Sequence, residues 1–181
     1  MSGQLHLYNI NIKYIRDLAN ADDNVLSVSP QTGKKDRPFI GILVMINGKQ
    51  YCAPLTSPKP KHKTMSKCFD FLKITENKDG EEKIIGVINF NNMIPVHPSV
   101  ICRIDLKVTS NDTPEVRKHK MLMAKQLNWC RSNSDKIAKN SQKTYNIVVN
   151  GKGNSNLLRR CCDFTKLEAV LEKWLHKKVT E

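Results

Sequence analysis

The chain has 181 residues, 39% of them hydrophobic, and a formal net charge of +13 at pH 7. These values predict one domain with a single hydrophobic core, and the charge favours a polyanionic partner, above all nucleic acid, over a merely soluble basic surface. No apolar run approaches the roughly 18 residues of a membrane span, and residues 1–10 lack a signal peptide's apolar stretch, so we expect a cytoplasmic protein without membrane contact.

The first part of the chain predicts two strands separated by a helix and a loop. Residues 6–10 fit a short strand, and residues 11–21 place apolar side chains on one helical face. Residues 21–37 are polar and rich in turn formers, so we expect a surface loop. Residues 39–46 form an apolar run that is too short for a typical helix and fits a buried strand.

Asn47 and Gly48 follow this run, and Asn-Gly after an apolar strand is the strongest short-range hairpin signal. They predict that residues 49–55 return as an antiparallel partner strand. The residues directly after this strand are therefore expected at a fixed place, at the end of a rigid hairpin. Farther on, residues 64–74 carry apolar side chains at helical spacing, which predicts a helix.

The middle of the chain predicts further extended structure. Residues 78–82 (KDGEE) are typical of a turn, and residues 83–90 fit another apolar strand. Residues 91–106 contain two prolines, so we expect interrupted extended segments with a last strand at 101–106.

Helical signals dominate the last third. Thr113–Pro114 is a favourable helix start, with Thr as N-cap, and Ser134 can cap a second helix that Asn150–Gly151 ends. Residues 152–156 are expected to form a loop, and residues 163–179 show the clearest amphipathic pattern.

Together these elements predict an α+β fold, in which an antiparallel β-sheet comes first and helices pack on it. We predict a single domain over residues 1–181. Its sheet-rich core would span residues 1–110 and its helical half residues 111–181.

The segment APLTSPKPKHK, residues 53–63, brings two hydroxyl groups and three lysines to the end of the predicted hairpin. The hydroxyls of Thr56 and Ser57 can donate hydrogen bonds to a phosphate oxygen, and Lys59 can neutralise its charge. On RNA, such groups suit attack of a ribose 2′-OH on the neighbouring phosphorus, which leaves a 2′,3′-cyclic phosphate and a 5′-OH. The same residues also fit a phosphate-binding loop or a solvated basic turn.

Further candidates lie near this loop and after the strand at 83–90. His62 is the candidate base because imidazole titrates near neutrality, but a histidine among lysines also fits a surface or phosphate contact. Asn89, Asn91 and Asn92 can bind bases or phosphates, or they can cap backbone groups in a turn.

Positive charge is densest at residues 117–160, which contain eleven Lys or Arg residues and one acid. We expect these side chains to bind RNA phosphates, while any single one of them can also be merely solvent-exposed. Trp129 and Trp174 lie on or beside apolar helix faces, so core packing is favoured over base stacking. The basic residues predicted to contact RNA are Lys34, Lys35, Lys61, Lys63, Lys118, Lys120, Lys125 and Arg131.

The sequence does not predict a metal site or a cofactor. The six cysteines include no Cys-x-x-Cys pair, and the five histidines are scattered along the chain. This spacing fits reduced and mostly buried thiols of a cytoplasmic protein.

The order of the motifs resembles the ToxN/AbiQ family of bacterial type III toxin–antitoxin endoribonucleases, which includes CptN-type toxins. The resemblance rests on KYI at 13–15, RPFIGILVMINGKQYCAPLTSPKPKH at 37–62 and GVINFNNMIPV at 86–96, followed by a helical C-terminal half. It covers most of the chain in order. The central hairpin block is specific because it combines several motifs.

The resemblance implies a twisted antiparallel sheet, similar to the Kid/MazF-like toxin core, with helices packed around it. It implies metal-independent, sequence-selective cleavage of cellular or phage mRNA, and a possible role in phage defence. The expected partner is an RNA pseudoknot antitoxin that the toxin cuts from a repeat precursor. Protein and RNA would alternate in a closed assembly that requires no direct protein partner.

The family's key threonine, serine and lysine match Thr56, Ser57 and Lys59, but the family's catalytic lysine falls on Arg37. Arginine binds phosphate bidentately but stays charged, so it is a poorer proton donor than lysine. Either Arg37 acts purely as a clamp, or neighbouring Lys34 or Lys35 supplies the proton. This departure keeps a non-catalytic basic RNA-binding module as the alternative function.

Overall fold

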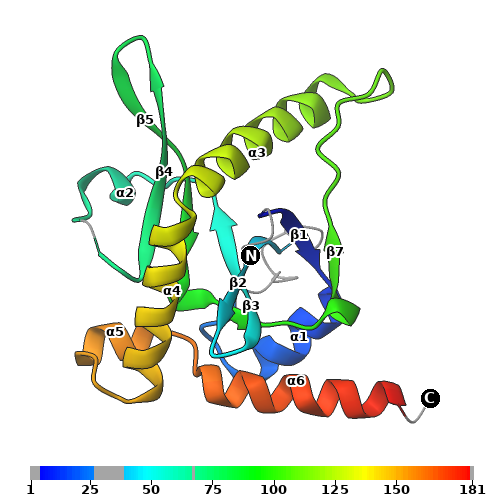
Figure 1. The fold of residues 1–181 in the computed structure, drawn as a ribbon, viewed down its shortest axis with the longest axis vertical. Coiled ribbons are helices and arrows are strands. Elements are labelled where there is room, and N and C mark those ends of the chain that lie inside the picture. Colours follow the sequence, from blue (N-terminus) through cyan, green and yellow to red (C-terminus); the bar gives the residue numbers. More distant parts are fainter. Residues whose placement is uncertain (1–4, 27–38, 67, 180–181) are drawn as a thin grey trace.

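The computed structural model describes residues 5–26, 39–66 and 68–179 and places strands and helices as Figure 1 shows. The strands are β1 (Leu7–Ile10), β2 (Ile40–Ile46), β3 (Lys49–Thr56), β4 (Phe71–Lys78), β5 (Glu81–Asn89), β6 (Ile94–Pro95) and β7 (Ile101–Arg103). The helices are α1 (Ile12–Ala21), α2 (Lys61–Thr64), α3 (Pro114–Ser132), α4 (Ser134–Val149), α5 (Ser155–Arg160) and α6 (Phe164–Val179). Two 3₁₀ turns, Phe90–Asn92 and Pro98–Val100, flank β6.

The strands form one antiparallel sheet in the order β4-β5-β3-β2-β1-β7, with β6 paired to β3. The predicted α+β class with an antiparallel sheet and packed helices is confirmed. Strand β3 pairs with β2 over residues 49–54 and with β5 at Leu55 and Thr56. The end of β3 is therefore the point at which the sheet passes from one hairpin to the other.

Two tight turns fix the hairpins. Asn47 and Gly48 join β2 to β3 with φ values of 50° and 78°, and Asp79 and Gly80 join β4 to β5 with φ values of 54° and 82°. Positive φ at both central residues is the backbone of a hairpin turn that matches strand twist. Both turns lie where the sequence predicts them.

Helices cover the sheet and close the core. Helix α3 packs against β4 and β5, where the buried Gln126 amide donates to Ile85 O at 2.8 Å. A Cβ at Gly86 would lie 2.7 Å from Gln126 Nε2, so a larger residue there would displace the Gln126 side chain from this position. Helix α6 runs beside α1 (Figure 1). Between the two helices, the rings of Tyr14 and Trp174 pack edge to face with centroids 5.4 Å apart.

A partly buried polar cluster joins β3, α4 and α6. The Glu168 carboxylate accepts hydrogen bonds from Tyr51 at 2.5 Å and Tyr145 at 3.0 Å, and it pairs with Lys49. Burial acts to raise the pKa of Glu168, but the hydrogen bonds from Lys49 and the two tyrosines outweigh it and hold that pKa below its ordinary value. The cluster ties the start of β3 to the helices.

The predicted helix at 64–74 is wrong. Residues 61–64 form the short α2, and β4 begins at Phe71. In β4, Phe71, Leu72 and Ile74 are buried and pair with β5 across the Asp79–Gly80 turn. Pairing with a distant strand therefore overrides the local helical spacing of the apolar residues.

Smaller differences concern the ends of elements. The last strand stops at Arg103 rather than at residue 106, because its partner β1 begins at Leu7. Helix α4 begins at Ser134, but Asn133 occupies the cap position. The loop expected at 152–156 is cut short by α5, whose N-cap Asn154 accepts from Leu157 N at 2.8 Å.

Within residues 5–26, 39–66 and 68–179, no helix combines the length and the apolar character that a membrane crossing requires. Over the same ranges, no group of three or more His, Cys, Asp or Glu side chains is arranged to hold a metal ion.

Candidate active site

The predicted catalytic hydroxyls lie at the end of β3. Thr56 is the last residue of the strand and is half-buried opposite Val87 of β5, whereas Ser57 is exposed. Pro58 follows and restricts Ser57 to extended conformations. The sheet thus holds one hydroxyl in place and presents the next one to solvent.

Asn89 joins Thr56 across the two strand ends. Its side-chain amide donates a hydrogen bond to Thr56 Oγ1 at 2.9 Å. Because the Thr56 oxygen accepts this bond, its own O–H hydrogen remains available to donate to a phosphate oxygen. The structure therefore brings Asn89, which the sequence predicts as an RNA contact, against a predicted catalytic hydroxyl.

The loop after Ser57 folds back on His62. Lys59 N donates to His62 Nδ1 at 2.8 Å, and His62 N donates to Lys59 O at 2.9 Å. The His62 residue is only 6% exposed, and its pKa is lowered by burial first and then by the charges of Lys61, Lys59 and Lys73. A neutral ring that accepts at Nδ1 carries its proton on Nε2. His62 therefore shapes the lysine loop.

Three lysines of this loop, Lys59, Lys61 and Lys63, are exposed. They stand on the turn that His62 closes, so their positive charges remain beside the strand end. Arg37, Lys34 and Lys35 lie outside the described residues.

Asn91 and Asn92 have partners inside the protein. The Asn91 amide donates to Arg160 O at 3.3 Å, and the Asn92 amide donates to Asn24 O at 2.8 Å. Both amides fasten the 3₁₀ turn at Phe90–Asn92 to neighbouring segments. This is the turn-stabilising alternative that the sequence left open.

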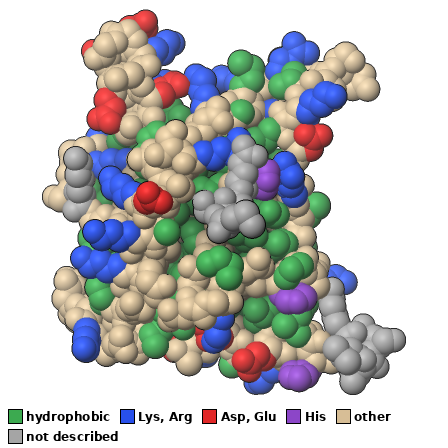
Figure 2. Space-filling view, in the orientation of Figure 1, with side chains coloured by type: hydrophobic (Ala, Val, Ile, Leu, Met, Phe, Trp, Pro, Cys, Tyr) green, Lys and Arg blue, Asp and Glu red, His purple; other side chains and the backbone are tan. Residues whose placement is uncertain are grey.

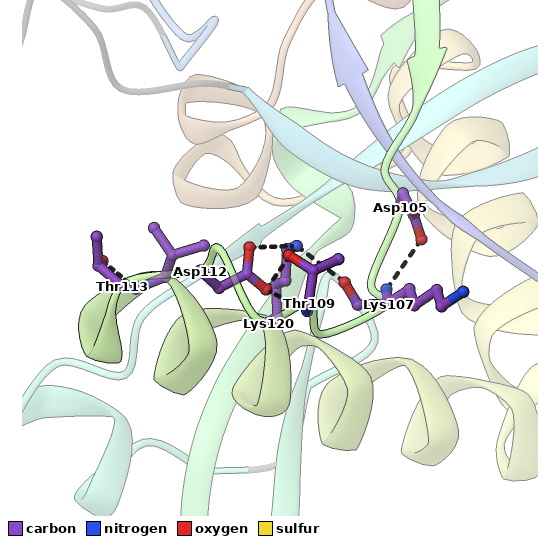
Figure 3. Close-up of polar contacts among 7 residues, drawn as sticks. Asp105, Lys107, Thr109, Asp112, Thr113 and Lys120 are labelled. Carbon is purple, nitrogen blue, oxygen red and sulfur yellow. Dashed lines mark hydrogen bonds and ion pairs between the residues drawn. The ribbon is translucent and has the colours of Figure 1, made fainter.

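The four α3 residues predicted to bind RNA differ in their partners. Lys120 Nζ lies 2.9 Å from the Asp112 carboxylate and also donates to Lys107 O, so it closes the loop before α3 (Figure 3). Lys125 pairs with Glu76 at 2.7 Å. Arg131 Nε donates a hydrogen bond to Leu5 O at 3.0 Å. Lys118 is exposed.

Sequence reasoning missed a large groove that starts at the lysine loop. Its volume is about 1440 Å³, and it runs from Pro58 and Lys59 along β4 and β5 to the junction of α3 and α4. The groove was not expected because part of its wall, the start of β4, was predicted to be helical. One signal was available, because Lys136, Asn140 and Lys143 recur at the spacing of a single helical face.

Comparison with known proteins gives the family. The model of the family "Toxin ToxN, type III toxin-antitoxin system" matches residues 6–172. A relative from Pectobacterium atrosepticum, named Endoribonuclease ToxN, is 37% identical over 168 residues, which are 91% of this chain and 90% of the relative.

Two solved structures share the fold. One, from work on a processed non-coding RNA that regulates a bacterial antiviral system, has a TM-score of 0.75 and 34% identity and covers 93% of this chain and 98% of its own. Another, from work on selective toxin inhibition by a non-coding RNA pseudoknot, has a TM-score of 0.77 and 29% identity. The match covers 95% of this chain and 98% of the other. The resemblance predicted from the sequence is confirmed: this chain belongs to the ToxN family of type III toxin–antitoxin toxins.

Proposed function

We propose that this chain is an endoribonuclease toxin whose active site is the end of β3. The observation that carries the proposal is the Thr56 hydroxyl, which accepts from Asn89 at 2.9 Å beside exposed Ser57 and Lys59. Membership of a family with a relative named as an endoribonuclease supports the reaction class.

The proposed reaction is a transesterification within the RNA. The ribose 2′-oxygen attacks the adjacent phosphorus and loses its proton, while the bond from phosphorus to the 5′-oxygen breaks and that oxygen gains a proton. Thr56 and Ser57 donate to the non-bridging oxygens, and Lys59 neutralises the charge that develops on them. The products carry a 2′,3′-cyclic phosphate and a 5′-OH.

The residues proposed to stabilise charge are not the ones proposed to transfer protons. His62 is buried with Nδ1 engaged by Lys59 N, so we assign it to shaping the loop and not to proton transfer. Arg37 acts as a phosphate clamp or leaves the proton role to Lys34 or Lys35.

We further propose that an RNA pseudoknot inhibits the toxin by occupying the same site. The likeness to a structure concerned with toxin inhibition by a non-coding RNA pseudoknot supports this partner. Protein and RNA would alternate in a closed assembly, and the toxin would release each repeat from a precursor. Cellular or phage mRNA in the bacterial cytoplasm is the proposed target.

The test is cleavage of a long single-stranded RNA in excess EDTA, with the product ends read by mass spectrometry. We expect cyclic-phosphate and 5′-OH ends from the parent protein and none from Ser57→Ala. Ser155→Ala, at an exposed helix start, is the matched control and should cut normally. If folded parent protein binds the RNA and leaves it intact, the RNA-binding module replaces the enzyme as the function.

A further inference from the structure

The groove beside the proposed active site has the size and position of an extended binding site. At about 1440 Å³ it exceeds the space that a single nucleotide needs, and Lys59 forms part of its wall. An RNA strand whose cut phosphate lies at Thr56 and Ser57 can therefore extend directly into the groove. The groove lies between the lysine loop on one side and the α3–α4 junction on the other.

The charge of the groove suits a phosphate backbone. Its described lining includes seven lysines, among them Lys73, Lys136 and Lys143, against three acids at residues 79–82. Figure 2 shows the acidic side chains gathered on the β4–β5 hairpin at upper left, with Lys and Arg along the edge below it. The lysines away from the acidic hairpin tip therefore line the groove on two sides, near the lysine loop (Lys59, Lys63, Lys73) and along α4 (Lys136, Lys143).

Aromatic rings supply the second feature. Phe69 and Trp129 line the groove and are half-buried, so each keeps part of its surface open. The ammonium group of Lys143 lies 4.6 Å from the centre of the Phe69 ring. This cation lies over the ring, so it can bind a phosphate while a base stacks on the part of the ring surface that the cation leaves open.

The backbone next to Phe69 is tied to the turn that follows Asn89. Asp70 O accepts hydrogen bonds from Phe90 N and Asn91 N. Helix α4 lies close on the other side, where Thr144 Oγ1 donates to Asn140 O at 2.8 Å and lies 3.4 Å from Phe69 O. The Phe69 backbone is thus held near the proposed active site.

We infer that this groove binds the single-stranded flank of the RNA that is cut, with bases stacked on Phe69 and Trp129 and phosphates on the lysines. The inference rests on the proposed function, because it takes the cut site to be at Thr56 and Ser57. It assigns Trp129 a contact surface in addition to the core packing expected from the sequence.

Binding is measured in the Ser57→Ala background, so that cleavage does not interfere, with a fluorescent single-stranded RNA of about 12 nucleotides. We expect Phe69→Leu, which keeps an apolar side chain but removes the ring, to weaken binding about tenfold. Phe69→Tyr keeps the ring and should bind like the parent. Lys143→Ala should also weaken binding, whereas Lys139→Ala, an exposed lysine of the same helix that does not line the groove, should not.

Two comparisons make the result decisive. A duplex of the same sequence should bind more weakly than the single strand, and its affinity should not change in Phe69→Leu. Parent-like affinity in both Phe69→Leu and Lys143→Ala, or an equal loss in Lys143→Ala and Lys139→Ala, would overturn the inference. Cleavage that persists in Ser57→Ala would instead overturn the proposed active site. The binding measurements would still test whether the groove binds the single-stranded RNA.

Discussion

The end of β3 and the basic face of α3 both contain cationic side chains, but the fold uses them differently. At the end of β3, Lys59 is exposed on a turn that His62 closes. On α3, Lys120 and Lys125 form ion pairs with Asp112 and Glu76. A high density of positive charge in the sequence therefore does not show which cations remain exposed and which are paired with acids inside the fold.

Charge reversal at Lys59 should give the largest effect. We expect Lys59→Glu to slow RNA cleavage by about 100-fold or more, because a cation beside the developing phosphate charge becomes an anion. Binding of the antitoxin RNA should weaken as well. Both are measured on the same preparation, by single-turnover cleavage and by titration with the RNA. Loss of one with full retention of the other would contradict a shared groove.

Substitution of Glu168 should lower the stability of the fold and leave the cleavage activity nearly unchanged. We expect Glu168→Gln to lower the free energy of unfolding by about 1–3 kcal/mol, because the buried hydroxyls of Tyr51 and Tyr145 lose a charged acceptor. Urea unfolding at pH 7 measures the change. Cleavage at 25 °C should stay near the parent rate.

The same carboxylate predicts a pH dependence. Its pKa in the folded protein lies below the ordinary value, so its contribution to stability is present above that ordinary pKa and is lost as the pH falls. The parent should therefore lose stability toward acid more steeply than Glu168→Gln. Parallel acid profiles would show that Glu168 is not held ionised by its partners.

Lys120 and Lys118 offer a paired test on one helix. Lys120→Ala should lower the melting temperature and leave cleavage nearly unchanged, because Lys120 ties Asp112 and Lys107 O to α3 (Figure 3). Lys118 is exposed, so Lys118→Ala should keep the melting temperature and weaken RNA binding at low salt. If Lys118→Ala lowered the melting temperature and Lys120→Ala weakened RNA binding, both assignments would be contradicted.

The smallest effect is expected at His62. Its pKa is lowered in the folded protein, so protonation breaks the bond from Lys59 N and the contribution to stability is lost as the pH falls below about 6.5. His62→Asn, whose amide oxygen can still accept, should flatten cleavage between pH 7 and pH 5.5 relative to the parent. A large loss of the cleavage rate at pH 7 in the variant would instead assign His62 a direct proton role, because the rate enhancement of a general base is lost with its side chain.

Local signals in the sequence were enough for much of the fold. The turns at Asn47–Gly48 and Asp79–Gly80 and the cap at Thr113 each depend on the conformations of a few adjacent residues. The strand at Phe71–Lys78 was missed because its stability comes from pairing with β5, which the helical spacing of its residues does not reveal. Turns and helix caps were therefore easier to predict than the secondary structure of an isolated apolar segment.

The candidate site could be proposed from the sequence only in part. Thr56, Ser57 and Lys59 were chosen as candidates because they follow the predicted hairpin directly. The bond from Asn89 to Thr56 spans 33 positions, and the pair between Lys125 and Glu76 spans 49. Partners at such separations come from the packed structure, so the sequence could not divide the basic residues of α3 into exposed and paired side chains.

The central claim is that Asn89 and Thr56 act together at the end of β3. The most direct test is a double-mutant cycle, with the single-turnover rate of RNA cleavage measured for Thr56→Val, Asn89→Ala and the double variant. We predict that the double variant is about as slow as Thr56→Val alone, since Asn89 acts through the Thr56 hydroxyl. Rate losses that multiply in the double variant would contradict the claim, because they would show that the two side chains act independently.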